Sequence, residues 1–322
     1  MKGFYTILSF ILLFYIILFP LTAIKGETEG ETKQNTSFLQ KSETSAKDDF
    51  KVKFSKTGKI ESVSAEEYVV GVVAAEMAAS SETEALKAQA VAAYTFATKR
   101  REESKEKYDI TDSSDTDQKY IDKSTRKEKW GDKSEEYEKK VKSAVQSVLG
   151  EVVTYNGKPI LAVYHAISSG RTESAKNVWG ETYSYLKSVE SVGDLLSPDY
   201  LEEKSFSTDE FFQKVKSLGV EKSETPENCL GEVSQTESGT VLKISVNGKT
   251  VSGFDLRKAF SLRSASFDLE YKDGKFVFTT RGYGHLVGLS QNGADYMAKQ
   301  GSSYKEILLW YYSGCKIQKS EV

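Results

Sequence analysis

The stretch that decides the fold runs Val69-Val70-Gly71-Val72-Val73-Ala74-Ala75-Glu76-Met77-Ala78-Ala79. It follows Ser64-Ala65-Glu66-Glu67, a Ser-x-x-Glu pattern that is typical of a capping box and predicts that a helix begins there. Glu76 is the lone charged residue of the apolar run, and burial disfavours the charged form of a carboxyl group. We therefore predict a raised pKa for Glu76 and an acid that can donate a proton near neutral pH. From this run alone, the alternative is a carboxylate on the solvated face of an ordinary helix.

The segments around this run predict an α+β fold without a βαβ repeat, as a single large or two-lobed domain. Ser80-Ser81-Glu82 interrupts the helix, and a second, alanine-rich helix is expected over 84–101. A polar loop is expected over 102–136 and an amphipathic helix over 137–149, and further helices start at Ser207 and span 295–312. Strands are expected at 51–54, 60–63, 151–155, 159–165, 241–246, 249–251, 267–269 and 275–280, with Asn-Gly hairpin turns at 156–157 and 247–248.

The chain begins with a long apolar segment. No charged residue separates Lys2 from Lys25, and the span between them exceeds the ~20 residues that cross a bilayer. A signal peptide would have a shorter apolar core and a better cleavage site than Thr22-Ala23-Ile24. We expect residues 1–25 to be an uncleaved transmembrane anchor, with a removed signal peptide as the alternative. Residues 26–50 are rich in Glu, Lys, Thr and Ser, which predicts a disordered linker before an exported domain over 51–322.

Charge and cysteine content exclude several classes of function. The net charge of −3 on a chain that is 28% charged provides no basic stripe for nucleic acid. Cys229 and Cys315 are the only cysteines, and they form either one disulfide of an exported domain or two buried thiols. No spacing of cysteine and histidine resembles a metal site, so neither a metal nor a cofactor is expected.

Both histidines lie in runs rich in serine or glycine. His165 precedes Ser168-Ser169-Gly170, and His285 lies within Gly282-Tyr283-Gly284-His285-Leu286-Val287-Gly288. Glycine at such density marks tight turns or a close approach of backbone to a ligand. The alternative is a buried turn whose histidine bonds to backbone carbonyls. A serine nucleophile paired with His165 is disfavoured, because no nucleophile elbow and no acidic partner accompany it.

The same motifs resemble the stage II sporulation protein D family. The resemblance is carried in order by residues 67–77, 84–93, 164–173, 178–179, 185–189, 262–267 and the glycine-rich run through to 317. It covers nearly everything from Phe54 onward. It implies a single-pass membrane protein whose extracytoplasmic domain lies in the intermembrane space of the sporulation septum and acts during engulfment of the forespore.

The activity that the resemblance implies is that of a lytic transglycosylase, which cuts septal peptidoglycan glycan strands already stripped of stem peptides by a partner amidase and leaves 1,6-anhydro ends. The family's essential glutamate falls on Glu76. One carboxylic acid suffices for this reaction, because the sugar's own 6-hydroxyl replaces the second carboxylate that an ordinary glycosidase needs. We expect the residues around it to bind glycan, with solvated or turn-stabilising roles as the alternative; they are Lys87, Gln89, His165, Ser168, Ser169, Tyr283, His285 and Gln291.

The chain departs from the family at several positions. Ala78 stands where proline is usual, Tyr94 where arginine is usual, and Leu286 and Asn292 where glycine and tyrosine are commoner. Some members bind zinc through Cys and His, which residues 110–118 lack, so no zinc is expected here. The second hypothesis is a non-catalytic module that binds peptidoglycan and activates an amidase, which the Tyr94 departure favours and the retained Glu76 disfavours.

Overall fold

The computed structural model describes residues 49–320. The expected anchor (1–25) and most of the expected linker (26–50) lie outside these residues. Within 49–320, no helix combines the length and apolar character needed to cross a membrane. Phe50, which the sequence assigns to the linker, is instead fully buried in the first strand, because its ring packs against Tyr68 and Tyr94. The ordered domain therefore includes Phe50, and the predicted linker boundary is wrong by at least one residue.

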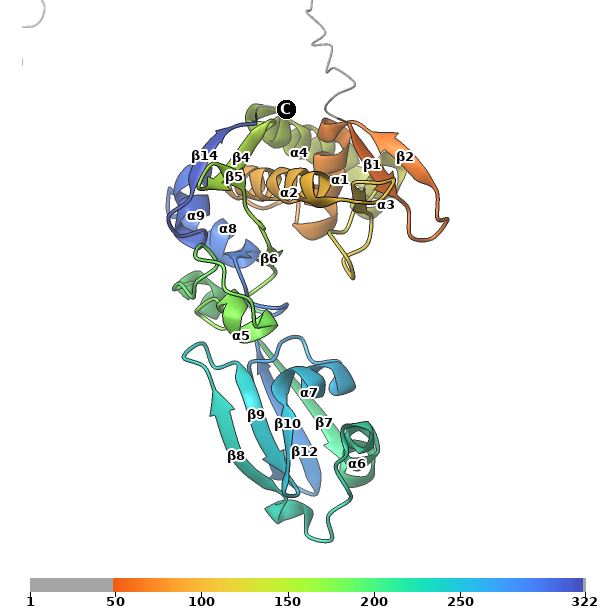
Figure 1. Ribbon diagram of the computed structural model, residues 1–322, viewed down its shortest axis with the longest axis vertical. Helices are drawn as coiled ribbons and strands as arrows, with labels where there is room; N and C mark the ends of the chain where they lie inside the picture. Colours follow the sequence, from red (N-terminus) through yellow and green to blue (C-terminus); the bar gives the residue numbers. More distant parts are fainter. Residues whose placement is uncertain (1–48, 321–322) are drawn as a thin grey trace, which may run out of the picture. The chain divides into compact units, whose positions relative to one another are not determined.

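A layer of helices, which Figure 1 shows, supplies much of the first hydrophobic cluster, and Glu76 ends one of these helices. Helix α1 (Ala65–Glu76) begins at Ser64, whose hydroxyl accepts the N–H of Glu67, as the sequence pattern predicts. Helix α2 (Thr83–Glu103) packs against α1 and α4 (Ser134–Val148), and its alanines allow the close approach. Two C-terminal helices, α8 (Gln291–Lys299) and α9 (Tyr304–Tyr311), also pack against α2.

Small sheets border this helical layer. β1 pairs antiparallel with β2 and parallel with β3, and β4 pairs antiparallel with both β14 and β5. β6 and β13 form a two-residue parallel pair that joins the two histidine-bearing segments, with Ser290 opposite His165. The bounds are β1 (Phe50–Lys53), β2 (Ile60–Val63), β3 (Ile110–Thr111), β4 (Glu151–Tyr155), β5 (Lys158–Pro159), β6 (Tyr164–His165), β13 (Leu289–Ser290) and β14 (Lys316–Lys319).

Residues between about 200 and 281 form a second hydrophobic cluster, which is dominated by phenylalanine. The rings of Phe211 and Phe276 stack with centroids 3.7 Å apart. Two antiparallel sheets, ordered β11-β12-β7 and β10-β9-β8, supply its strands. The elements are β7 (Leu201–Ser207), α6 (Thr208–Val215), β8 (Leu230–Gln235), β9 (Val241–Val246), β10 (Lys249–Ser252), α7 (Gly253–Phe260), β11 (Phe267–Lys272) and β12 (Lys275–Arg281). Cys229 and Cys315 are free buried thiols that belong to different clusters.

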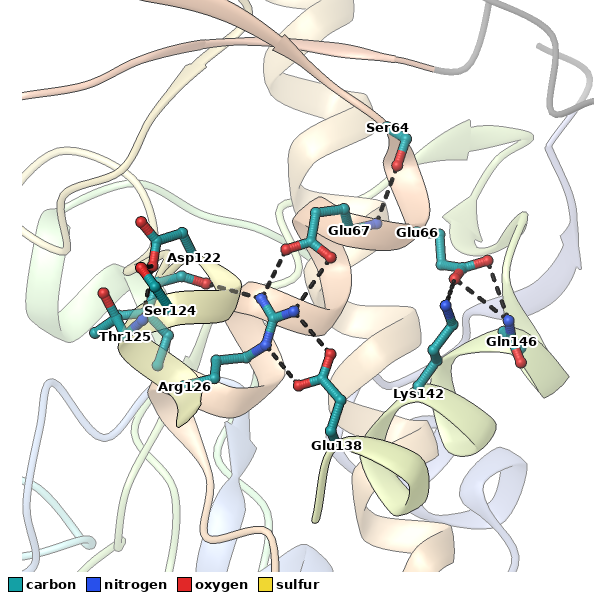
Figure 2. Close-up of polar contacts among 11 residues, drawn as sticks. Ser64, Glu66, Glu67, Asp122, Ser124, Thr125, Arg126, Glu138, Lys142 and Gln146 are labelled. Carbon is teal, nitrogen blue, oxygen red and sulfur yellow. Dashed lines mark hydrogen bonds and ion pairs between the residues drawn. The ribbon is translucent and has the colours of Figure 1, made fainter. Parts of the chain in front are cut away.

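The fold class is α+β, as predicted, but three local predictions are wrong. The expected loop over 102–136 contains α3 (Lys123–Trp130), whose Arg126 is fully buried between Glu67 of α1 and Glu138 of α4 (Figure 2). The expected strand over 159–165 is reduced to β5 and β6. The expected helix over 295–312 is two helices, because Gly301 adopts a φ of 92° and Ser303 opens α9 with a capping box.

Short helices complete the described chain. They are α5 (Ala175–Trp179) and the 3₁₀ turns η2 (Gly131–Lys133), η3 (Val192–Leu196), η4 (Lys216–Leu218) and η5 (Pro226–Asn228).

Candidate active site

Glu76 is the last residue of α1 and borders a pocket of about 290 Å³, which we call the Glu76 pocket. The chain leaves the helix at Met77 in an extended conformation, so the carboxyl group lies where the helix gives way to the loop before α2. That loop and helix α8 form the walls. The other lining residues are Met77, Ala78, Ser80, Ser81, Gln291, Asn292, Asp295 and Lys299.

Burial raises the pKa of Glu76 above its ordinary value, as the apolar run predicts. Its position at a helix C-terminus, where the helix dipole is negative, acts in the same direction. Opposing influences favour the ionised form: Oε1 accepts the backbone N–H of Lys119 at 3.0 Å, and the charges of Lys119 and Lys129 and the side chain of Gln291 stabilise it. Glu76 is thus an acid with a raised pKa whose conjugate base is also stabilised.

Two predicted glycan-binding residues meet beside Glu76. Gln291, at the start of α8, donates from Nε2 to Oε1 of Gln89 on α2 at 3.3 Å. Gln89 is fully buried and Gln291 is 8% exposed. Behind them, the hydroxyl of Tyr164 donates to Gln118 at 2.9 Å. Gln291 therefore lines the pocket directly, whereas Gln89 orients it from beneath.

The two histidines face each other with ring centroids 5.8 Å apart, and Trp179 lies 5.3 Å from His285. Nδ1 of His165 bonds to the carbonyl of Val287 at 3.0 Å, and Nδ1 of His285 accepts the N–H of Val287 at 3.1 Å. Burial lowers the pKa of His165 to about 4; burial, followed by the charges of His165 and Arg257, lowers the pKa of His285 to about 3. Both rings are therefore neutral near pH 7. Gly284 allows this arrangement, since a Cβ there would lie 2.8 Å from Cβ of His165.

Ser168 and Ser169, two of the predicted glycan-binding residues, form hydrogen bonds to distant parts of the chain. The N–H of Ser168 donates to Asp194 at 2.9 Å, and the hydroxyl of Ser169 donates to the carbonyl of Ser238 at 2.5 Å. Asp194 is fully buried and also accepts from the hydroxyl of Ser290 at 2.8 Å and the amide of Asn292 at 3.1 Å. Because Ser290 caps α8, Asp194 connects the serine segment to the helix that carries Gln291.

Lys87 and Tyr283 are not among the residues that line the Glu76 pocket. Lys87 pairs with Glu84 at 2.7 Å and lies 5.9 Å from the centroid of the Tyr304 ring. Tyr283 is 51% exposed under the guanidinium of Arg263. Gln291 is the one predicted glycan-binding residue in the lining of this pocket. A role in glycan binding stays a prediction for all eight residues.

Two of the positions that depart from the family, Tyr94 and Asn292, have local explanations. Tyr94 is buried in the core against Phe50, where it adds packing rather than a charge. Asn292 uses its amide to bond with Asp194 and the carbonyl of Gly193. Leu286 adopts a φ of 66°, a left-handed conformation that favours glycine.

Sequence reasoning missed several charged residues of this site. Lys119 and Lys129 belong to the polar segment expected as a loop, and Lys129 donates to the carbonyl of Ala74 at 2.7 Å. Asp295 is a second carboxylate in the pocket, which accepts the N–H of Glu82 at 2.7 Å and pairs with Lys299 at 2.6 Å. The i,i+4 spacing of Asp295 and Lys299 is a signal for their pairing, but it does not indicate the pocket.

Comparison with known proteins gives consistent matches. A model of the Stage II sporulation protein family matches residues 53–155, which include α1, Glu76 and α2. Stage II sporulation protein D of Bacillus amyloliquefaciens is 39% identical over 267 residues, which is 81% of this chain and 76% of that protein. The protein of the same name from Bacillus subtilis matches with the same identity and coverage.

A more distant relative has a different name. The amidase enhancer of Bacillus subtilis is 28% identical over 294 residues, covering 76% of this chain and 39% of that protein.

Proposed function

Because this chain belongs to the stage II sporulation protein D family, we propose that it is a peptidoglycan lytic transglycosylase acting in septal wall remodelling during endospore formation. The bond cleaved is the one between N-acetylmuramic acid and N-acetylglucosamine in peptide-stripped glycan. The observation that carries this proposal is Glu76, an acid with a raised pKa at the edge of a pocket. Membrane attachment through residues 1–25 and an extracytoplasmic site in the sporulation septum are parts of the same proposal.

Glu76 has two tasks in this reaction. In its protonated form it donates the proton to the glycosidic oxygen, and the bond from that oxygen to C1 of the muramic acid breaks. The resulting carboxylate, stabilised by the N–H of Lys119 and the charge of Lys129, then removes the proton from the 6-hydroxyl of the same sugar. The 6-oxygen bonds to C1, which closes the 1,6-anhydro ring, and no water is consumed.

The alternative function of a conventional hydrolase would require Asp295, the second carboxylate of the Glu76 pocket, to take part in the reaction. Glycosidases use a second carboxylate as base or nucleophile. Here both oxygens of Asp295 are engaged, one by the N–H of Glu82 and the other by Lys299. A carboxylate committed to those two donors supports the wall of the pocket and is poorly placed to attack a sugar.

The name of the distant relative supports a second candidate, a non-catalytic module that binds peptidoglycan and enhances a partner amidase. The transglycosylase needs the carboxylic acid of Glu76, whereas the amidase-enhancing module does not. The test incubates the full-length protein and its Glu76→Gln variant with peptide-free glycan strands and follows chain length by mass spectrometry. Shortening by the wild type and none by the variant supports the transglycosylase. Intact strands in both incubations, together with stimulation of an added amidase by both proteins, would favour the enhancer.

A further inference from the structure

A second and larger hollow lies between α3 and α4, and it shares no lining residue with the Glu76 pocket. Its volume is about 510 Å³, and we call it the lysine pocket. Helix α3 provides Lys123 and Lys127, one turn apart, and Trp130 at its end; α4 provides the rest. The lining residues are Lys123, Lys127, Trp130, Ser134, Glu135, Glu138, Lys139 and Lys142.

The pocket is positively charged although the chain is acidic. Residues 119–142 contain nine basic and six acidic side chains, against a net charge of −3 for the whole chain. Glu138 is already paired with the buried Arg126 at 2.9 Å, and Lys142 is paired with Glu66 at 3.0 Å (Figure 2). Among residues 49–320, no carboxylate lies within ion-pair distance of Lys123, Lys127 or Lys139. Four lysines of the lining (Lys123, Lys127, Lys139 and Lys142) therefore outnumber its two glutamates, Glu135 and Glu138.

The remaining lining side chains suit a sugar. Trp130 is partly exposed, and its ring is held edge-to-face against Tyr137 with centroids 6.0 Å apart. A fixed indole offers an apolar face for the C–H face of a pyranose. Ser134 and Glu135 offer hydrogen-bond partners for hydroxyl groups. A phosphate polymer without sugar rings would leave the indole face of Trp130 unused.

The same two helices support the Glu76 pocket. Lys129 of α3 donates to the carbonyls of Ala74 and Ala75 in the last turn of α1. Lys140 of α4 donates to the carbonyl of Ser81 at 2.6 Å, within the loop that lines the Glu76 pocket. The two helices that line the lysine pocket therefore also contact α1 and the loop beside Glu76. In α4, the residue that makes this contact, Lys140, directly follows Lys139 of the lysine pocket.

We propose that the lysine pocket is a binding subsite for an acidic glycan, whose carboxylates pair with Lys123, Lys127 and Lys139 while one of its sugar rings stacks on Trp130. This inference rests on the proposed function for the identity of the polymer. In a peptidoglycan strand the acidic group is the lactyl carboxylate of N-acetylmuramic acid, which is free only where the stem peptide has been removed. The subsite accordingly binds segments of a strand that have lost their stem peptides, and it holds them near α1, the helix that ends at Glu76.

The test measures binding of peptide-free glycan strands to the full-length protein carrying Glu76→Gln, so that cleavage cannot intervene. In that background, Lys123→Gln, Lys127→Gln and Lys139→Gln are combined. The matched control removes the same charge at the exposed Lys56, Lys272 and Lys275. We expect about tenfold weaker binding for the pocket variant and less than twofold for the control, because each exposed charge pair contributes modestly. The difference should shrink as salt is raised from low to high concentration.

Two further probes identify the ligand. Glycan strands whose carboxyl groups have been converted to amides should bind the parent protein as weakly as the pocket variant binds the native strands. Poly(glycerol phosphate) should compete poorly. Equal binding of native strands by the pocket variant and the control would overturn the subsite, and so would full affinity for amidated strands or stronger binding of the phosphate polymer. If the binding results are as expected but the wild-type protein does not cleave the strands, the proposed function is overturned and the subsite is not.

Discussion

Arg126→Met should lower the free energy of unfolding by about 3 kcal/mol, because it removes one partner of a buried ionic cluster, for which losses of roughly 3–5 kcal/mol are typical. The guanidinium of Arg126 is fully buried and donates to both oxygens of Glu67 and both of Glu138, at 2.8 to 3.2 Å (Figure 2). It also donates to the carbonyl of Ile121 at 3.1 Å. We take the lower end because the side chains of Glu67 and Glu138 are 39% and 24% exposed and regain water when the arginine is lost.

Equilibrium urea unfolding at pH 7 measures this change. The matched control is Lys142→Met, which breaks a more exposed pair with Glu66 and should cost less than about 1 kcal/mol. A loss below about 1 kcal/mol for Arg126→Met would refute the reasoning, since a buried cluster would then be no more important than a surface pair.

The pH dependence provides an independent check on the same cluster. Hydrogen bonding to Arg126 lowers the pKa of Glu138 in the folded protein. A carboxyl group with a lowered folded pKa stabilises the fold above its unfolded pKa of about 4.3, and this stabilisation is lost as the pH falls through the folded pKa. The wild type should therefore lose more stability than Arg126→Met between pH 5 and more acidic conditions. Parallel pH curves for the two proteins would contradict the assignment.

Three further substitutions probe the site. Lys129→Gln removes a charge that lowers the pKa of Glu76, so the alkaline decline of the cleavage rate should move to higher pH; an unmoved or acid-shifted pH–rate profile would argue against Glu76 as the proton donor. Asp194→Asn leaves one acceptor for several buried donors and should cost about 2–3 kcal/mol in thermal or urea unfolding, with an unchanged midpoint as the contrary result. Asp295→Asn keeps an acceptor for the N–H of Glu82 and should reduce kcat by less than about tenfold. A much larger loss of kcat, of the size caused by removing a general acid or base, would identify Asp295 as a second catalytic carboxylate.

Local signals in the sequence predicted the elements that bear Glu76. Ser64 caps α1 as its Ser-x-x-Glu pattern indicates, and the Ser80-Ser81-Glu82 interruption separates α1 from α2. Alternation and Asn-Gly turns likewise located β9 and β10. These features depend on neighbours within a few residues, which is why a single chain reveals them.

Features that depend on distant partners were missed. Residues 123–130 carry too many charges to read as a packed helix. Asp122 caps this helix, and the pairing of Arg126 with Glu67 and Glu138 holds it against α1 and α4. The N–H of Lys119 reaches Glu76 across 43 positions, and a backbone donor leaves no residue-type signal. Asp194 was missed for a related reason, since the donors Ser168, Ser290 and Asn292 come from two segments that are distant from it in sequence.

The most direct test of the central claim, that Glu76 directs attack by the sugar's own 6-hydroxyl, is digestion of peptide-free glycan strands in ¹⁸O-labelled water. The full-length wild type and Glu76→Gln are compared, and the new chain ends are read by mass spectrometry. We expect unlabelled ends that lack the elements of water in the wild type, and no new ends with the variant. Labelled reducing ends would mean that water is the nucleophile, and new ends from Glu76→Gln would mean that Glu76 is not the acid.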